Sequence, residues 1–325
     1  MTGEEAPSGK RIPGLERGRR FYGAIKGSRL LGILLLTAFL GAAVVVLFRD
    51  WQRLRTYSFE LQPGLLALSF VVECVGLLLA VLVWRQLLLR FTRPIAYSDD
   101  LRIYSYSMLG VVLPGGIWSV VSRSALYERR GISAFDVGTA SVIEFILMGI
   151  AGLLVYALLA FVQPVHVIWQ RPAIAVAMVL VALALIQPPL FNRIANWLNR
   201  RAGKKRVQAV PLRYWDLLRW LIMECGVVAI GGVAVYLLLQ SVTPTSLDLL
   251  FPIISAWAVA VVTGNLFFWL PGTPVIRDGF MALILAQLLP PALAIAFVVI
   301  VRVWTLLSIL VLIGLIWVLI EPKSR

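Results

Sequence analysis

Six charged residues lie inside otherwise apolar segments, and these are the groups of the chain that could do chemistry. They are Glu73, Arg123, Glu144, Glu224, Arg277 and Arg302. An ionised side chain at the centre of a bilayer costs roughly 2.5–3.5 kcal/mol, so such residues pair with one another or line a substrate or ion path. Glu144 and Arg302 each lie well inside a predicted helix, at a depth of about 15 Å. We therefore expect Glu144 and Arg302 to form a mid-membrane ion pair, which either fixes helix register or works in a site.

Two Pro-Gly breaks accompany these charges. Leu113-Pro114-Gly115-Gly116 and Leu270-Pro271-Gly272 interrupt apolar segments and cannot continue a helix. Unpaired backbone at membrane depth is tolerated only where protein or a water-filled cavity satisfies it, and transporters build midplane sites this way. The alternative is a tight turn outside the membrane. Recurrence favours the buried break, because an arginine follows each one, Arg123 after the first and Arg277 after the second.

Composition argues against other reaction centres. The chain has one histidine and two cysteines, and both cysteines fall inside predicted spans, so we expect neither a metal site nor a structural disulfide. No phosphate-binding glycine loop or nucleophile elbow is present, and we expect no enzyme activity and no cofactor. The formal net charge of +14 arises mainly in connections between apolar segments, so we expect no nucleic-acid partner.

The elements that must position these residues are membrane helices. Of 325 residues 60% are hydrophobic and 14% charged, with a mean hydropathy of +0.90. Several runs reach the roughly 20 apolar residues that span a bilayer, and none alternates like a barrel strand. We predict an all-α polytopic membrane protein with about six full spans and two broken re-entrant hairpins. The spans are expected at 30–48, 63–84, 135–161, 173–191, 215–240 and 292–320, and the hairpins at about 98–127 and 249–289.

Charge distribution predicts the orientation of the chain. Residues 1–29 form a basic tail, and residues 30–320 form the membrane domain. If both hairpins re-enter, most of the 30 lysines and arginines fall on one side, as the positive-inside rule requires of a cell-membrane protein with both termini in the cytoplasm. The second hairpin is less constrained, because residues 248–269 are long enough to cross. We expect residues 241–248 and 286–291 to face outside.

Two residue types in the spans have expected structural roles. Tryptophans at span ends are expected to anchor at the interface, and they are Trp84, Trp169, Trp215 and Trp317. Glycines inside the spans are expected to allow close helix packing, and they are Gly149, Gly152, Gly226, Gly231 and Gly232.

The two halves of the chain, about 30–161 and 173–320, match at three places. Glu73-Cys74 corresponds to Glu224-Cys225, the two Leu-Pro-Gly tripeptides correspond to each other, and Glu144 and Arg302 follow their prolines at similar distances. With two opposed hairpins, this pattern predicts an inverted repeat. Repeats of this kind place a binding site at the membrane midplane between the halves.

These motifs resemble a known family. Leu113-Pro114-Gly115-Gly116 with Arg123 and Glu144, and Pro271-Gly272 with Arg277-Asp278-Gly279 and Arg302, look like the lysylphosphatidylglycerol synthase transmembrane region family of flippase-like proteins. The resemblance covers about residues 30–320. It implies a lipid-translocation module of the prokaryotic cell membrane, often associated with glycosyltransferases or lipid-modifying enzymes. The sequence departs from the family pattern at Trp118-Ser119 and at Asp278, where a glutamate is usual.

The leading hypothesis is a flippase for a lipid with an anionic or sugar-phosphate headgroup, such as a polyprenyl phosphate. Arg123 and Arg277 would bind the phosphate, while Glu144 and Arg302 would gate or relay charge. Residues of the two breaks would expose backbone groups to the headgroup, and they are Pro114, Gly115, Gly116, Pro271 and Gly272. The alternatives are a non-catalytic scaffold or accessory subunit of a glycosyltransferase or lipid-modifying system, and an ion-coupled transporter of a small solute.

Overall fold

The computed structural model describes residues 60–112, 117–162, 172–201, 211–268, 270 and 273–320, together with positions 37, 41 and 45. The basic tail, residues 1–29, lies outside the described residues. So do the break residues, which are Pro114, Gly115, Gly116, Pro271 and Gly272. Of the expected first span, 30–48, only positions 37, 41 and 45 are described, and they are helical.

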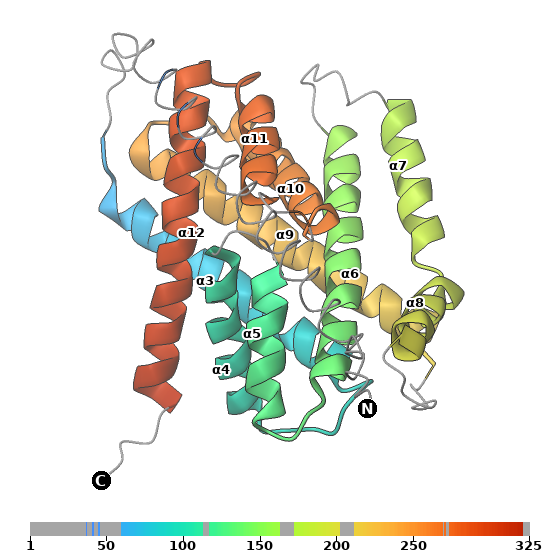
Figure 1. Cartoon of the computed structure of the whole chain (residues 1–325). Helices are drawn as coiled ribbons and strands as arrows, with labels where there is room; N and C mark the ends of the chain where they lie inside the picture. Colours follow the sequence, from blue (N-terminus) through green and yellow to red (C-terminus); the bar gives the residue numbers. More distant parts are fainter. Residues whose placement is uncertain are drawn as a thin grey trace, which may run out of the picture.

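The described ranges contain helices and no strand (Figure 1). The elements are α3 (Pro63–Leu88), α4 (Tyr97–Met108), η1 (Leu109–Val112), α5 (Ile117–Glu128), α6 (Ala134–Ala160), α7 (Pro172–Leu185), α8 (Pro188–Arg201), α9 (Tyr214–Val242), η2 (Leu247–Leu249), α10 (Leu250–Leu266), α11 (Thr273–Leu285) and α12 (Pro291–Ile320). Within these ranges five helices are long and apolar enough to cross a membrane, namely α3, α6, α9, η2 with α10, and α12. The predicted class, an all-α polytopic membrane protein, is confirmed.

Helices α3 and α9 pack against each other in antiparallel directions through the middle of the molecule (Figure 1). At one end the amide of Gln62 donates to the carbonyl of Ser241 over 2.8 Å. At the other end Arg90 forms an ion pair with Asp216. These two contacts keep α3 and α9 side by side along their length.

The two broken segments lie toward opposite ends of the molecule (Figure 1). Arg130, after α5, pairs with Asp99 at the start of α4 over 2.8 Å, so the first segment returns to the end from which it came. The end of α12 lies at the same place, because Arg102 donates to the carbonyl of Ile320 over 2.8 Å. The connection from α11 to α12 lies at the other end of the molecule (Figure 1). The inverted repeat built on these hairpins stays a prediction.

The predicted span 173–191 differs in the structure. The chain bends by 55° between α7 and α8, and the pair counts as one span only if both pieces are taken together. The cause is Pro188-Pro189, because proline lacks an amide hydrogen and keeps the preceding residue out of the helical region. Residues 193–201, expected in a basic connection, instead continue α8. That helix is amphipathic, with Phe191 fully buried and Trp197 half exposed, as in helices that lie along a membrane surface.

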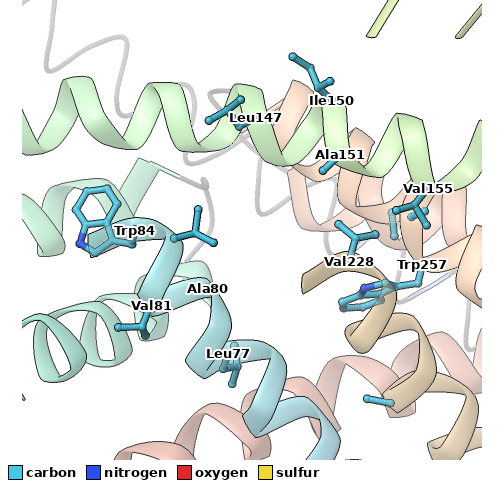
Figure 2. Packing of buried hydrophobic residues seen from close by; sticks show 14 of the residues in the cluster. Leu77, Ala80, Val81, Trp84, Leu147, Ile150, Ala151, Val155, Val228 and Trp257 are labelled. Carbon is cyan, nitrogen blue, oxygen red and sulfur yellow. The ribbon is translucent and has the colours of Figure 1, made fainter. Parts of the chain in front are cut away.

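Buried apolar side chains from α3, α6, α9 and α10 form one core (Figure 2). Glycines let these helices approach closely, as expected for Gly152, Gly231 and Gly232. A Cβ at Gly232 would lie 2.9 Å from the Cα of Ile254 on α10, and one at Gly152 would lie 3.0 Å from the carbonyl oxygen of Ala258. The other two predicted glycines are less crowded, with the nearest atoms at 3.9 Å for Gly149 and 3.3 Å for Gly226.

Replacing Gly232 by alanine is expected to destabilise the protein, because the new methyl group must push the α10 backbone away. Overpacking of this kind costs about 1–3 kcal/mol. Thermal unfolding in detergent, followed by size-exclusion fluorescence, measures the effect. Gly138→Ala on α6 is the control, since a Cβ there meets nothing within 4 Å. Equal melting temperatures for the two variants would contradict the proposed close approach of α9 and α10.

The hairpin arrangement predicts which surface positions are accessible from each side. A cysteine introduced at the exposed Gln287, after α11, should react with an impermeant maleimide added outside intact cells. One at the exposed Glu128, at the end of α5, should react only after the membrane is opened. Both are tested with Cys74 and Cys225 replaced by alanine. Labelling of position 287 solely in opened cells would mean that α10 and α11 together cross the membrane.

Candidate functional site

The first hairpin places Arg123 against Glu144. Arg123 on α5 donates from Nη1 to Oε2 of Glu144 on α6 over 2.6 Å, and both side chains are almost completely buried. Tyr104 on α4 donates its hydroxyl to the other carboxylate oxygen over 3.0 Å. The Nε of Arg123 donates to the hydroxyl of Ser107 over 3.1 Å. Both oxygens of Glu144 and two nitrogens of Arg123 are therefore satisfied inside the protein.

Aromatic rings complete the surroundings of Arg123. The guanidinium lies 4.2 Å from the ring centroid of Trp84 and 4.1 Å from that of Tyr104. A desolvated cation–π contact contributes about 2 kcal/mol. Gly110 brings the two arms of the hairpin together, because a Cβ there would lie 2.6 Å from the amide nitrogen of Ser119. The first hairpin is a closed, internally neutralised unit.

Trp84 does not have the interfacial position predicted from its place near a span end. It is fully buried, and its indole donates to the hydroxyl of Tyr127 over 2.8 Å. Tyr127 in turn donates to Asp100 over 2.7 Å, and Asp100 forms an ion pair with Arg85.

At this mouth of the hairpin, outside the spanning helices, burial raises the pKa of Asp100 although Tyr127 and Arg85 oppose the shift. Burial also raises the pKa of the Tyr127 phenol, which keeps it a donor. Trp215 and Trp317 are exposed, and Trp169 lies outside the described residues.

The second hairpin carries a different ion pair. Asp278 on α11, which is buried, pairs with Arg302 on α12. Sequence reasoning marked Asp278 only as a departure from the family pattern, although its place next to Arg277 was a usable signal. The side chain of Arg302 remains 36% exposed, unlike that of Arg123.

Four charges on the hairpins and their following helices were marked from the sequence, namely Arg123, Glu144, Arg277 and Arg302. Among the described residues, Arg277 has the least complete set of partners of these four. Its Nε lies 4.0 Å from Asp278, at the limit of an ion pair, and is buried without a hydrogen-bond partner in the described structure. Its guanidinium lies 4.9 Å from the ring centroid of Trp257 on α10. Its stem passes the open face of Gly264, where a Cβ would lie 3.4 Å from the Arg277 Cδ. The side chain is 23% exposed.

The predicted ion pair between Glu144 and Arg302 is wrong. Each of these residues pairs instead with the hairpin that precedes its own helix, Glu144 with Arg123 and Arg302 with Asp278. The reason is packing: α6 lies against α5, α9 and α10, whereas α12 lies against α11 and α4. The long helix after the first hairpin, α6, carries the negative charge of its pair, whereas the long helix after the second, α12, carries the positive charge.

Two further carboxylates lie on the central helices. Glu73 on α3 and Glu224 on α9 are both buried, and Oε2 of Glu224 has no hydrogen-bond partner among the described residues. Glu224 lies in the electrostatic field of Arg123 and Glu144, and Glu73 in that of Arg277. Each central carboxylate therefore lies near the charges of the hairpin from the other half. Within the described residues no three metal-ligating side chains gather.

The sequence matches a known protein family. The model for the lysylphosphatidylglycerol synthase TM region matches residues 29–314. The chain belongs to this family. It is accordingly a multi-pass integral membrane protein, and the resemblance read from the two Pro-Gly motifs is confirmed. No curated protein and no solved structure gives a significant match.

Replacing Glu144 by glutamine is expected to lower the yield of folded protein strongly, because Arg123 is left as a buried cation without a counterion. Loss of one partner of a buried pair costs about 3–5 kcal/mol. Folded yield is measured by size-exclusion fluorescence after extraction from membranes. Glu224→Gln is the matched control, since it removes a buried carboxylate whose Oε2 has no hydrogen-bond partner among the described residues, and its yield should remain close to that of the wild type.

The pairing itself is tested by a second substitution. Combining Glu144→Gln with Arg123→Gln should recover part of the yield, because no unpaired charge remains. Combining Glu144→Gln with Arg302→Gln should give additive losses, because the two residues do not share a partner. If folded yield instead recovered with Arg302→Gln and the losses were additive with Arg123→Gln, the Glu144–Arg302 pair predicted from the sequence would be correct.

Proposed function

We propose that this protein is a flippase that moves a lipid with an anionic or sugar-phosphate headgroup across the cell membrane. The observation that carries the proposal is Arg277, a membrane-embedded arginine whose Nε has no hydrogen-bond partner in the described part of the chain and whose side chain is partly exposed. An arginine in this environment favours an anionic partner, and phosphate is a group that its planar fork binds with two parallel hydrogen bonds.

The surroundings of Arg277 support binding of one negative charge. Among the described residues, Arg277 and Arg302 share one ion-pair partner, Asp278, and Glu73 on α3 acts on Arg277 only from beyond ion-pair distance. Within the described part of the second hairpin there is therefore one arginine more than its own acid neutralises. A phosphate held by Arg277 would complete this cluster. The headgroup then reaches membrane depth next to fixed charges rather than in hydrocarbon, where an unpaired ion is costly.

The first hairpin has a different role in this proposal. Arg123 is already neutralised by Glu144 and enclosed by Trp84 and Tyr104, so we assign it to holding α4, α5 and α6 together rather than to the headgroup. The motion that alternates access is then a shift of α10 and α11 relative to this rigid unit, as in transporters whose halves rock around a midplane site. In this proposal the protein carries out no covalent chemistry, and both of its termini lie in the cytoplasm.

A second candidate is a scaffold or accessory subunit for a glycosyltransferase or lipid-modifying enzyme. The first hairpin favours this candidate, because Arg123 is already neutralised by Glu144 and holds helices together. A scaffold needs no incompletely partnered arginine at membrane depth, however, and Arg277 is therefore the residue that separates the two functions.

The proposal is tested in proteoliposomes with fluorescent phosphatidylglycerol and fluorescent phosphatidylcholine, by following how much probe an external quencher can reach. We expect translocation of the anionic probe by the wild type and at least a tenfold loss with Arg277→Gln. Arg219→Gln, which removes an exposed arginine on α9, is the charge-matched control and should retain activity. Failure of the wild type to move this probe and a polyprenyl-phosphate probe would favour the scaffold.

A further inference from the structure

An apolar groove lies between α11 and α12 beside the charged cluster. It has a volume of about 530 Å³, within the range of about 300–1,000 Å³ that small-molecule sites occupy. Its wall on α11 is a stripe at helical spacing, and its wall on α12 comes from the first turns of that helix. The residues that define it are Val275, Gly279, Leu283, Ala286, Pro291 and Ile295.

Gly279 provides the space in this groove. A Cβ built at Gly279 meets no heavy atom within 4 Å, so the hollow continues up to the α11 backbone. The lining residues Phe280 and Leu283 are 43% and 65% exposed, so their side chains leave the groove open. Both helices are apolar here, and the surrounding medium of a membrane protein is hydrocarbon. The occupant that fits this setting is a hydrocarbon chain.

The charged cluster adjoins this groove. Asp278 directly precedes Gly279 in α11, and it pairs with Arg302. Arg302 lies seven residues, or two helical turns, beyond the groove residue Ile295 on α12, and therefore on the same side of that helix. A chain lying along the groove would thus have Arg302, with its partner Asp278, at its mid-membrane end.

We propose that the α11–α12 groove binds the acyl or prenyl chain of the transported lipid while Arg302 and Arg277 hold its phosphate. The inference rests on the proposed function and adds a chain-binding subsite to it. Lipid tails are as apolar as the groove lining, so a chain gains little by leaving the bilayer for the groove. The selectivity must therefore come from the charged end. An ordinary lipid at the protein surface would show no such dependence on the headgroup.

The test uses phosphatidylglycerol with a photoreactive diazirine near the end of one acyl chain, in proteoliposomes of the full chain. After irradiation, mass spectrometry locates the attached lipid. We expect attachment within residues 275–295. Gly279→Leu should reduce it at least fivefold by filling the groove, and Ala286→Leu provides a second, independent obstruction. Gly314→Leu on α12 is the matched control, because a Cβ at Gly314 also meets nothing within 4 Å and the residue is not part of the groove.

Two comparisons make the outcome decisive. Attachment should fall at least fivefold with Arg302→Gln, and the equivalent phosphatidylcholine probe should attach at least fivefold less than phosphatidylglycerol. Equal attachment of both probes, or no effect of Arg302→Gln, means ordinary surface lipid and overturns the inference. So does attachment confined to other helices. Translocation is measured separately on the same variants, so a protein that flips lipid without labelling the groove refutes the subsite alone. One that labels the groove without flipping refutes the proposed function.

Discussion

The structure depends on the need to neutralise charges that lie at membrane depth. The ion pair between Arg123 and Glu144 meets this need most completely, with Tyr104 and Ser107 as further hydrogen-bond partners and Trp84 stacked on the guanidinium. A pair of this kind gives little net stability over apolar packing, but leaving either member alone is costly. The requirement therefore acts as a constraint on geometry. It holds the broken hairpin α4–α5 against α6 in one arrangement, although the hairpin is too short to cross the membrane by itself.

Much of the fold could be predicted from the sequence, because its main signals are local. A run of about 20 apolar residues has few alternatives to a spanning helix, and Pro-Gly in such a run has few alternatives to a break. Four of the five long helices, α3, α6, α9 and α12, follow from the first rule. The fifth, η2 with α10, is also long enough to cross, although the prediction placed it in the second hairpin. The bend before Pro188-Pro189 follows from the equally local rule that proline disfavours helix at the preceding residue. It was not predicted, because the residues around it are apolar enough to continue a span. The basic segment after it continues the helix, because helical spacing places Phe191 and Ala195 on one buried face of α8.

The site was less predictable, because its contacts depend on which helices pack together. The sequence marks Arg123, Glu144, Arg277 and Arg302 as charges in apolar segments, and all four do belong to membrane-embedded ion-pair clusters. Their partners could not be read from depth alone, since two residues at equal depth can lie on helices that never meet. Trp84 illustrates the same limit: its position near the end of an apolar run is compatible with an interfacial ring and with a ring buried under a re-entrant hairpin, and only the hairpin's packing distinguishes them.

The two hairpins neutralise their arginines to different degrees, and this difference makes the two ends of the molecule unequal. Each places an arginine against a tryptophan, Arg123 against Trp84 and Arg277 against Trp257. In the first, the acid on the following long helix neutralises the arginine. In the second, the long helix carries another arginine, Arg302, and the acid Asp278 on the hairpin pairs with it. The one ion-pair contact of Arg277 among the described residues is then with the same carboxylate, at 4.0 Å. An anion approaching the first cluster would have to displace an existing counterion. At the second it would supply a contact that Asp278 makes only at 4.0 Å and that Glu73 on α3 provides only through its more distant field. For the proposed flippase, headgroup binding is therefore expected on the α10–α11 side, with the first hairpin as the fixed body against which that side would move.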